Sequence, residues 1–505
     1  KENIPAATQL FTPNWIVRYL VENSLGRLWM LNHPDSGLKD RMKYFIAPDA
    51  DAHEEFKRVS FPEEITVCDP ACGSGHILVY AFELLAAMYE ESGYMRRDIP
   101  QVILENNLSG MEIDPRAGAL ASFALTMKAL EMDSRFLRRG VQPDIKVLEP
   151  VSFIEEELGL VPEIAGRKAL LDAVEHMDEC GSLYEPEEDD LAALKIAADR
   201  LTSGISDLFA DSATKKTGAM LADCEALARK FDVVVANPPY MGSKNMNSWL
   251  SGWIRKNYPD VKSDLFSAFI VRNTNYGYQF AELGFMTPYV WMFIGSYEKL
   301  RSFLIDQKTI TSLIQLEYSG FAGATVPICT FTLHNSCVAE YCGGYVRLSD
   351  FVGADNQAPK ALEAIQNPNC GWFYRRNAKD FTIIPGSPIA YWASGFALGA
   401  FLSGCPLAEY ATLAQGLKCG DTDYFIKAWY EVCERDVLPP LECDVSDQDR
   451  KWHFLQNGGD YRKWFGNNLD VVNWSNDGFE IKHFKDGNGK LRSRVQNERF
   501  YHSGG

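Results

Sequence analysis

Short apolar runs alternate with helical patterns along the first part of the chain. Residues 65–68 form an apolar run that ends in a turn, and apolar residues then recur at helical spacing from Ile77 to Tyr89. A helix is also predicted over 116–131, and further strands are predicted at 102–104, 108–113, 145–148, 231–236, 283–287, 311–316 and, as part of an edge hairpin, 327–333. Repeated strand–turn–helix units are typical of a doubly wound sheet. We therefore predict a Rossmann-like α/β fold.

This pattern changes at two places. Residues 151–230 hold 18 acidic side chains against 8 basic ones, and they predict an acidic helical insertion over 150–230, with two or three helices beside the sheet. After the breaker cluster of residues 385–388, short segments rich in Trp, Tyr, Gly and Asn replace the strand–helix units. We predict a first domain over 1–394 and a second domain over 395–505.

The overall charge limits the classes of partner. A net charge of -18 at pH 7 argues against a uniformly basic surface for nucleic acid. Residues 450–505 nevertheless carry 10 Lys+Arg against 6 Asp+Glu. Both a local basic face and ordinary solvated charge fit that segment.

Composition also bears on location. The apolar runs fall short of the roughly 18 to 20 residues that a membrane helix needs, and the 12 cysteines lack paired Cys-x-x-Cys spacing. We expect a soluble cytoplasmic protein that binds neither a metal nor a membrane. Because the chain starts at Lys1 and ends within what reads as a loop, we expect it to be a fragment of something longer.

Two turns carry candidate ligand-binding residues. The segment Asp69-Pro-Ala-Cys-Gly-Ser-Gly75 follows a predicted strand and opens a predicted helix, where its glycines and free N–H groups allow close approach of an anionic ligand. A simple tight connection is the alternative. Glu112 ends the next strand, where a carboxylate accepts hydrogen bonds from ribose hydroxyls, as also in nicotinamide enzymes. Asp114, ahead of Pro115, is expected to cap a helix and is left out of the site.

The tetrad Asn237-Pro-Pro-Tyr240 directly follows the clearest predicted strand. Its two prolines fix the backbone, so the Asn237 side chain and the Pro238 carbonyl can accept both hydrogens of one amino group. That geometry would direct the nitrogen lone pair at a sulfonium methyl, in a transfer governed by positioning and charge stabilisation. Tyr240 would stack on a flat base. A turn without chemistry is the alternative.

An enzyme that acts on a duplex base has to rotate the base out of the stack and hold it between flat or apolar side chains. Phe321, on a glycine-rich loop, could supply the second face of such a base. An isolated phenylalanine also fits a place in the core.

Four segments together resemble a known family. Phe11-Thr-Pro13, the turn of residues 69–75, the segment 110–115 and the tetrad of residues 237–240 resemble motifs X, I, II and IV of amino-methyltransferases, in the order of the gamma class of N6-adenine enzymes. The runs 7–26 and 240–246 resemble the PglX family, the methyltransferases of BREX phage-defence systems. The resemblance implies a class I S-adenosylmethionine-dependent methyltransferase sheet, followed by a mixed α/β target-recognition domain.

The resemblance also implies an activity and its partners. The expected reaction is site-specific methylation of adenine N6 in double-stranded DNA by base flipping, with S-adenosyl-L-methionine as methyl donor. Expected partners are duplex DNA, other defence-system proteins and phage-encoded inhibitors.

The family's residue roles transfer as expectations. Glu149, followed by Pro150, matches an acidic position after the third strand where Asp is commoner. The catalytic set is Asn237, Pro238, Pro239, Tyr240 and Phe321. The DNA contacts are Lys244, Arg462 and Lys463. The cofactor set is Phe11, Thr12, Pro13, Asp69, Pro70, Ala71, Cys72, Gly73, Gly75, Glu112, Ile113, Glu149, Pro150 and Asn237.

Other functions remain open. A methyltransferase acting on a protein glutamine or on RNA would use the same tetrad, because it serves any planar amide or amine. The chain could also be the methyltransferase subunit of a restriction-modification enzyme, or a non-catalytic or partner-dependent DNA-recognition component. Cytosine C5 chemistry needs a Pro-Cys nucleophile, which the sequence lacks.

Overall fold

The computed structural model describes residues 12–48, 54–202, 208–321, 326–438, 450–464 and 466–501. The chain divides into two compact units, Lys1–Leu402 and Ser403–Gly505. Each unit is considered by itself below.

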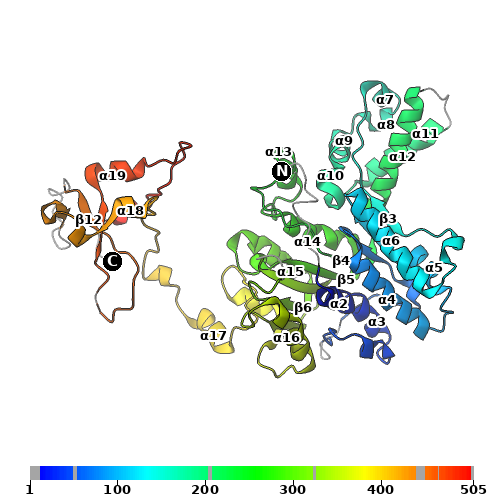
Figure 1. Ribbon diagram of the computed structural model, residues 1–505, viewed down its shortest axis with the longest axis horizontal. Coiled ribbons are helices and arrows are strands. Elements are labelled where there is room, and N and C mark those ends of the chain that lie inside the picture. The colour runs from blue at the N-terminus through cyan, green and yellow to red at the C-terminus, as the bar shows by residue number, and fades with distance from the viewer. Residues whose placement is uncertain are drawn as a thin grey trace. The chain divides into compact units, whose positions relative to one another are not determined.

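The first unit is built on a nine-stranded sheet with the order β3-β2-β1-β4-β5-β7-β6-β8-β9 (Figure 1). Among the first seven strands, only β7 runs antiparallel to its neighbours. This order and this single reversed strand are those of the class I methyltransferase sheet expected from the sequence. The strands are β1 Val67–Asp69, β2 Leu108–Glu112, β3 Asp144–Val147, β4 Phe231–Ala236, β5 Gly277–Pro288, β6 Thr309–Gln315, β7 Ile328–His334, β8 Cys342–Arg347 and β9 Phe373–Asn377.

Two predicted strands need correction. Residues 102–104 are helical, because they continue α5 (Ile99–Val102) into a π-turn, Ile103–Asn107. A short apolar run fits a buried helix turn as well as a strand, and Ile103 and Leu104 are indeed buried. The second correction concerns β7, which lies between β5 and β6 and not at an edge. All of its residues are buried, as expected of a central strand.

Helices cover both faces of this sheet (Figure 1). Successive residues of β4 face opposite sides, since Val233 and Val235 belong to one hydrophobic core and Val234 to the other. The core around Val233 contains residues from four helices: α2 (Asn14–Glu22), α3 (Leu25–Asn32), α4 (His76–Glu91) and α6 (Pro115–Met132). The core around Val234 contains residues from α14 (Leu265–Tyr276) and α15 (Glu298–Gln307).

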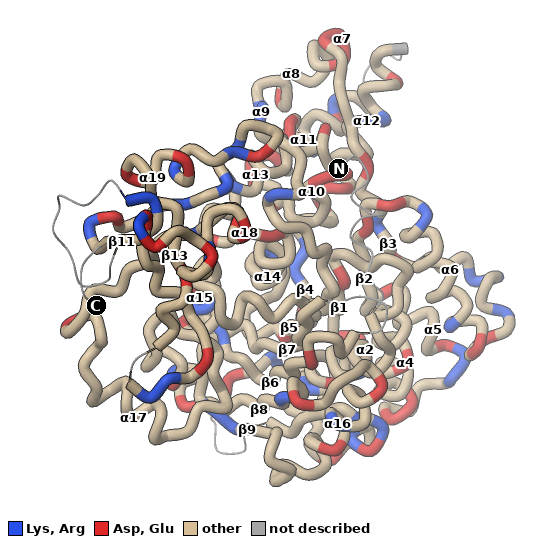
Figure 2. The backbone as a smooth tube through the Cα atoms, turned by 60° about the vertical axis from the view of Figure 1, so that its left-hand side comes forward, with Lys and Arg blue, Asp and Glu red and all other residues tan. Residues whose placement is uncertain are grey.

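The acidic segment between β3 and β4 is helical, as predicted, but has more helices than expected. Its described residues form α7 Glu155–Gly159, α8 Pro162–Ala165, α9 Lys168–Glu175, α10 Met177–Cys180, α11 Glu188–Thr202 and α12 Leu208–Ala228. The acidic residues of α7 stand out in Figure 2. Apolar residues such as Leu170, Val174 and Leu194 join the same core as strand residues Cys68 and Met111. The insertion therefore packs on the sheet.

The second unit holds a four-stranded sheet with the order β10-β13-β12-β11. Phe425, Val472, Trp474 and Ile481 form its small core. This is a mixed α/β unit, and a target-recognition role for it stays a prediction. Its elements include β10 Ile426–Ala428, β11 Val437–Leu438, β12 Trp452–Phe454, β13 Asp470–Asn473, α18 Thr422–Phe425 and α19 Ser475–Lys482. Over the described part of the whole chain, none of the helices is long and apolar enough to cross a membrane.

Candidate active site

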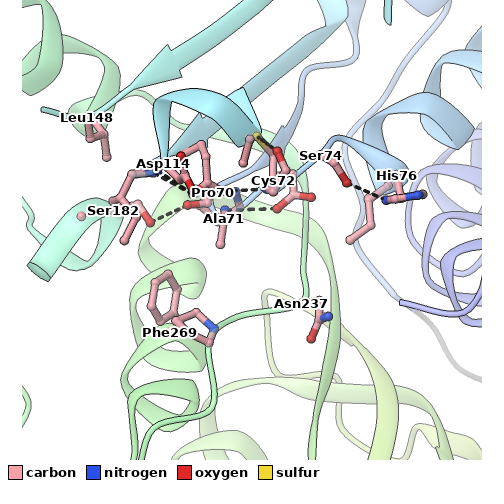
Figure 3. A pocket seen from close by; sticks show the side chains of 18 of the residues that line it. Pro70, Ala71, Cys72, Ser74, His76, Asp114, Leu148, Ser182, Asn237 and Phe269 are labelled. Carbon is pink, nitrogen blue, oxygen red and sulfur yellow. Dashed lines mark hydrogen bonds between the residues drawn. The ribbon is translucent and has the colours of Figure 1, made fainter. Parts of the chain in front are cut away.

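A cavity of about 510 Å³ opens at the carboxyl ends of β1, β2 and β4 (Figure 3). Ligands bind at this edge in doubly wound sheets. The structure brings together here most of the predicted cofactor set and part of the catalytic set. The lining includes Thr12, residues 69–74, residues 112–114, Leu148, residues 179–182, Asn237, Pro239, Leu265 and Phe269.

The first turn is shaped by two glycines in the left-handed region. Gly73 has a φ of 52° and Gly75 a φ of 84°, a conformation that favours glycine. A Cβ atom at Gly75 would come within 3.0 Å of the Cβ of Ala121 on α6. Gly75 therefore serves the close passage of the chain past α6, and it does not belong to the cavity lining.

Glu112 ties the second turn to the first. Its Oε2 accepts the Gly73 N–H at 2.7 Å, and its Oε1 accepts the N–H groups of Ile113 at 2.9 Å and Asp114 at 3.0 Å. A carboxylate offers about four lone-pair sites. Three are used here, so about one remains for a ligand hydroxyl. Glu112 is thus held rigidly in the lining.

Asp69 lies in the same lining and is almost fully buried. Its Oδ1 accepts the Ala71 N–H at 3.1 Å. Burial raises the pKa of Asp69 to about 8, and the nearby Glu112 carboxylate acts in the same direction, against the Ala71 hydrogen bond. Asp69 is therefore mostly protonated at neutral pH.

Asn237 lies across the cavity from the turn that holds Pro70 to Ser74 (Figure 3). Its Nδ2 donates to Thr12 Oγ1 at 3.0 Å, and its Oδ1 accepts the Tyr240 hydroxyl at 2.7 Å. That hydroxyl also lies 3.0 Å from the carbonyl oxygen of Met286 on β5. The amide of Asn237 is therefore oriented from both sides. The Asn237 side chain thus lies in the lining with its amide plane fixed.

The rest of the tetrad supports this arrangement. Pro239 lines the cavity, whereas Pro238 and Tyr240 do not. The Tyr240 ring meets Phe266 edge-on, with centroids 6.3 Å apart. Burial raises the pKa of Tyr240 well above its usual value, so its hydroxyl keeps its proton. Stacking of Tyr240 on a base stays a prediction.

Several predicted cofactor residues are not found in the described lining. Phe11 is outside the described residues. Pro13 precedes α2 as its N-cap and is not in the lining. Glu149 and Pro150 are exposed, and the neighbouring Leu148 lines the cavity instead. Their cofactor contacts therefore stay predictions.

The predicted base and DNA contacts are also away from the lining. Phe321 is only 7% exposed and joins the core that contains Leu316 and Ile328. Lys244 is exposed on the segment that follows the tetrad. Arg462 and Lys463 are exposed in the second unit. The roles of these residues are not tested by their positions.

The sequence missed a wall of the cavity that comes from the insertion. Ser182 Oγ donates to the Pro70 carbonyl at 2.5 Å. Gly181 has a φ of 46°, and a Cβ atom there would lie 2.8 Å from Ile113 Cγ2. The insertion thus closes the cavity against both cofactor turns. Nothing local in the acidic segment pointed to this contact, because it depends on packing between distant parts of the chain.

Other missed lining residues lie next to predicted ones. Ser74 Oγ and His76 Nδ1 are hydrogen-bonded at 3.0 Å where α4 begins. Asp114 caps α6 as predicted, accepting the Arg116 N–H at 2.9 Å. Asp114 and Arg116 nevertheless also line the cavity. A helix cap at a strand end can therefore belong to a ligand site as well.

The chain matches methyltransferase families over much of the first unit. Residues 106–321 match the model of the Eco57I restriction-modification methylase. Residues 54–153 match the MmeI DNA-methyltransferase domain. These ranges contain the three strand-end turns that line the cavity.

Curated relatives cover nearly the whole chain. It is 37% identical to the adenine-specific methyltransferase BrxX of Escherichia coli O9:H4 (strain HS), over 99% of this chain and 43% of the relative. It is 34% identical to the adenine-specific methyltransferase PglX of Lacticaseibacillus casei (strain Zhang), over 99% of this chain and 44% of the relative. The chain thus spans less than half the length of these relatives.

Among solved structures, the chain is similar to the type I restriction-modification system methyltransferase subunit from Streptococcus thermophilus. The identity is 12% and the TM-score 0.41, over 76% of this chain and 59% of that chain. The fold itself is defined by the strand order given above. With the match to the two curated relatives along 99% of its length, the chain belongs to the family of BrxX and PglX.

Proposed function

We propose that this chain transfers a methyl group from S-adenosyl-L-methionine to N6 of adenine in double-stranded DNA. The observation that carries the proposal is the Asn237 amide, held by Thr12 and Tyr240 across a cavity from Glu112 and the Asp69 turn. The names of the curated relatives, both adenine-specific methyltransferases, support the same reaction.

The lining suits this methyl donor. Glu112 offers a rigid carboxylate with a site for a ribose hydroxyl. The turn before α4 presents a helix N-terminus to the methionine carboxylate. Ile113, Leu148 and Phe269 provide apolar contacts for an adenine ring. When bound, S-adenosylmethionine supplies an electrophilic methyl group on a sulfonium.

The residues of the tetrad would orient the target amino group. In the proposed complex, Asn237 Oδ1 would accept one hydrogen of the target amino group and the Pro238 carbonyl would accept the other. When both amino hydrogens are bound by these two acceptors, the lone pair of the amino nitrogen points away from the acceptors. They also stabilise the positive charge that develops on that nitrogen. Thr12 and Tyr240 keep the Asn237 amide from rotating, so little reorganisation is needed in the transition state.

The biological role belongs to the same proposal. The family resemblance supports marking of host DNA in a BREX-like phage defence, together with other defence-system proteins. Because the chain spans less than half of its relatives, activity is expected of the full-length protein that contains it.

Two measurements on the purified full-length protein test the reaction. Incubation with unmodified duplex DNA and S-adenosylmethionine should yield N6-methyldeoxyadenosine in the digested DNA, detected by mass spectrometry. Titration calorimetry should show Glu112→Ala weakening cofactor binding while Asn237→Ala spares it. A product other than N6-methyladenine, or equal loss of cofactor affinity in both variants, would contradict the proposal.

A further inference from the structure

Residues 241–264, which we call the rim segment, rise from the edge of the cavity. Pro239 just before the segment and Leu265 just after it both line the cavity. Gly242 and Asp264 form an antiparallel bridge, and the Ser243 N–H donates to the Ser263 carbonyl at 3.0 Å. Between these paired ends lies α13 (Ser248–Asn257). The rim segment therefore stands beside Asn237.

The rim segment carries four exposed cationic side chains. Lys244 and Lys262 each lie two residues from a member of the Gly242–Asp264 bridge, in the turns at the two ends of the rim segment. Arg255 and Lys256 lie in the last turn of α13. All four side chains are exposed. We call Lys244, Arg255, Lys256 and Lys262 the rim cations.

Acidic residues of the same segment leave these cations available. The Asp264 carboxylate is engaged by backbone donors, accepting the N–H groups of Met241 at 2.9 Å and Phe266 at 3.3 Å. Asp260 forms an ion pair with Lys299. Among the residues that the structure describes, no ion pair involves a rim cation. The rim segment thus presents free positive charge on a chain whose net charge is -18.

The acidic insertion contacts the other end of α13. Asn247 Nδ2 donates to Glu179 Oε2 at 2.5 Å, and Trp249 Nε1 donates to Asp172 Oδ1 at 3.0 Å. The Trp249 ring also stacks on His176, with centroids 4.0 Å apart. These contacts hold the first half of the helix and leave its last turn, with Arg255 and Lys256, facing solvent. The support of the rim cations is therefore ordered, which lowers the entropy cost of binding.

We propose that the rim cations bind phosphates of duplex DNA beside the adenine that enters the site. The inference rests on the proposed function. Contacts to phosphates position a duplex without reading its sequence, and a basic patch beside the site concentrates them there despite an acidic total charge. DNA fits better than an acidic protein, because the segment that carries these cations is flanked by residues of the cavity that would receive the base.

The test replaces the four rim cations in the full-length protein, as K244Q/R255Q/K256Q/K262Q. Binding to a fluorescent duplex of arbitrary sequence is measured by anisotropy over a range of salt concentrations. We expect binding about 10- to 100-fold weaker near physiological salt. The slope of log affinity against log salt should be smaller by roughly 0.9 for each phosphate that the variant no longer neutralises. The weakening should be the same for every sequence.

A matched variant changes four exposed cations at the amino ends of the strands, R96Q/R135Q/R138Q/K230Q. It should bind DNA as the wild type does. Cofactor affinity, measured by calorimetry, should be unchanged in both variants and reports that they are folded. If the quadruple rim variant does not fold, K244Q/K262Q and R255Q/K256Q are measured separately, and each should show part of the weakening.

Three results would overturn the inference: an unchanged affinity and salt slope in the rim variant, an equal weakening in the matched variant, or a wild type that does not bind duplex DNA. Failure of the proposed function gives a different result. In that case the wild type binds duplex DNA through the rim cations but forms no N6-methyladenine.

Discussion

At the scale of single residues, the site depends on how the Asn237 amide is held. Thr12 accepts from its Nδ2, and Tyr240 donates to its Oδ1. Thr12 comes from the segment before α2 and Asn237 from the loop after β4, so their hydrogen bond joins parts of the chain 225 residues apart. Thr12 therefore acts as a positioning residue for Asn237.

Replacement of Thr12 by valine should lower the rate of methyl transfer. Valine keeps the shape of threonine but cannot accept from Asn237 Nδ2, so the amide loses this restraint. We expect kcat to fall about 10- to 100-fold while cofactor affinity changes little. Thr12→Ser keeps the hydroxyl and should retain most of the activity. A decrease of cofactor affinity as large as the decrease of kcat would show that Thr12 acts through the cofactor instead.

Asp69 should make stability depend on pH. Its pKa is about 8 in the folded chain, above the value of 3.8 for an unperturbed Asp. Between these two pH values the folded state therefore holds a proton that the unfolded state releases. The contribution of Asp69 to the free energy of unfolding is fully present below pH 4 and is lost as pH rises through 8. Urea denaturation at pH 5, 6.5 and 8 should show the wild type losing stability relative to Asp69→Asn. A difference between the two that stays constant with pH would contradict this assignment.

At the scale of elements, the insertion helps to build the cavity. Its turn at Gly181 and Ser182 packs on Ile113 and on the Pro70 carbonyl. The two contacts place a segment between β3 and β4 against the turns that follow β1 and β2. The acidic helices thus do more than cover one face of the sheet.

Substitution of Gly181 by alanine should weaken cofactor binding. The new Cβ would lie 2.8 Å from Ile113 Cγ2, and the φ of 46° strains any residue with a side chain. We expect about a tenfold loss of affinity in calorimetry, since Ile113 has to move within the lining. Gly166→Ala, in the same insertion, meets no atom within 4 Å and has a φ of -88°, so it should bind normally. Equal behaviour of the two variants would contradict a role of the turn in the cavity.

The elements with strong local signals were predictable from the sequence. The strand before Asn237 and the helices after Gly75 and Asp114 lie where the apolar spacing indicated. The run 102–104 was wrong, because three apolar residues do not distinguish a strand from a buried helical turn. The internal position of β7 was missed for a related reason, since a continuous apolar run does not reveal which strands flank it.

The residues of the candidate site were likewise predictable only in part. The turns at Asp69, Glu112 and Asn237 could be found because each follows a strand and carries a distinctive local pattern. The contacts of Gly181 with Ile113 and of Thr12 with Asn237 could not, because they arise from long-range packing. Phe321 was selected from a glycine-rich context, and the structure places its ring in the core.

At the scale of the whole molecule, the proposed function requires an acidic chain to bind a polyanion. The net charge of -18 includes an insertion rich in Asp and Glu, while the rim cations are exposed on a segment flanked by two cavity-lining residues. Under the proposed function, the chain therefore has both a local basic surface for the duplex and a site for one amino group. Because the chain spans less than half of BrxX or PglX, these properties are best tested in the full-length protein.

The most direct test of the central claim is modified-base sequencing of chromosomal DNA from cells that carry the full defence system. With the wild-type protein, N6-methyladenine should occupy one adenine in every copy of a single asymmetric motif. With Asn237→Ala, the same motif should be unmodified while the protein remains present at its normal level. Absence of N6-methyladenine with the wild type, or unchanged methylation in the variant, would contradict the account.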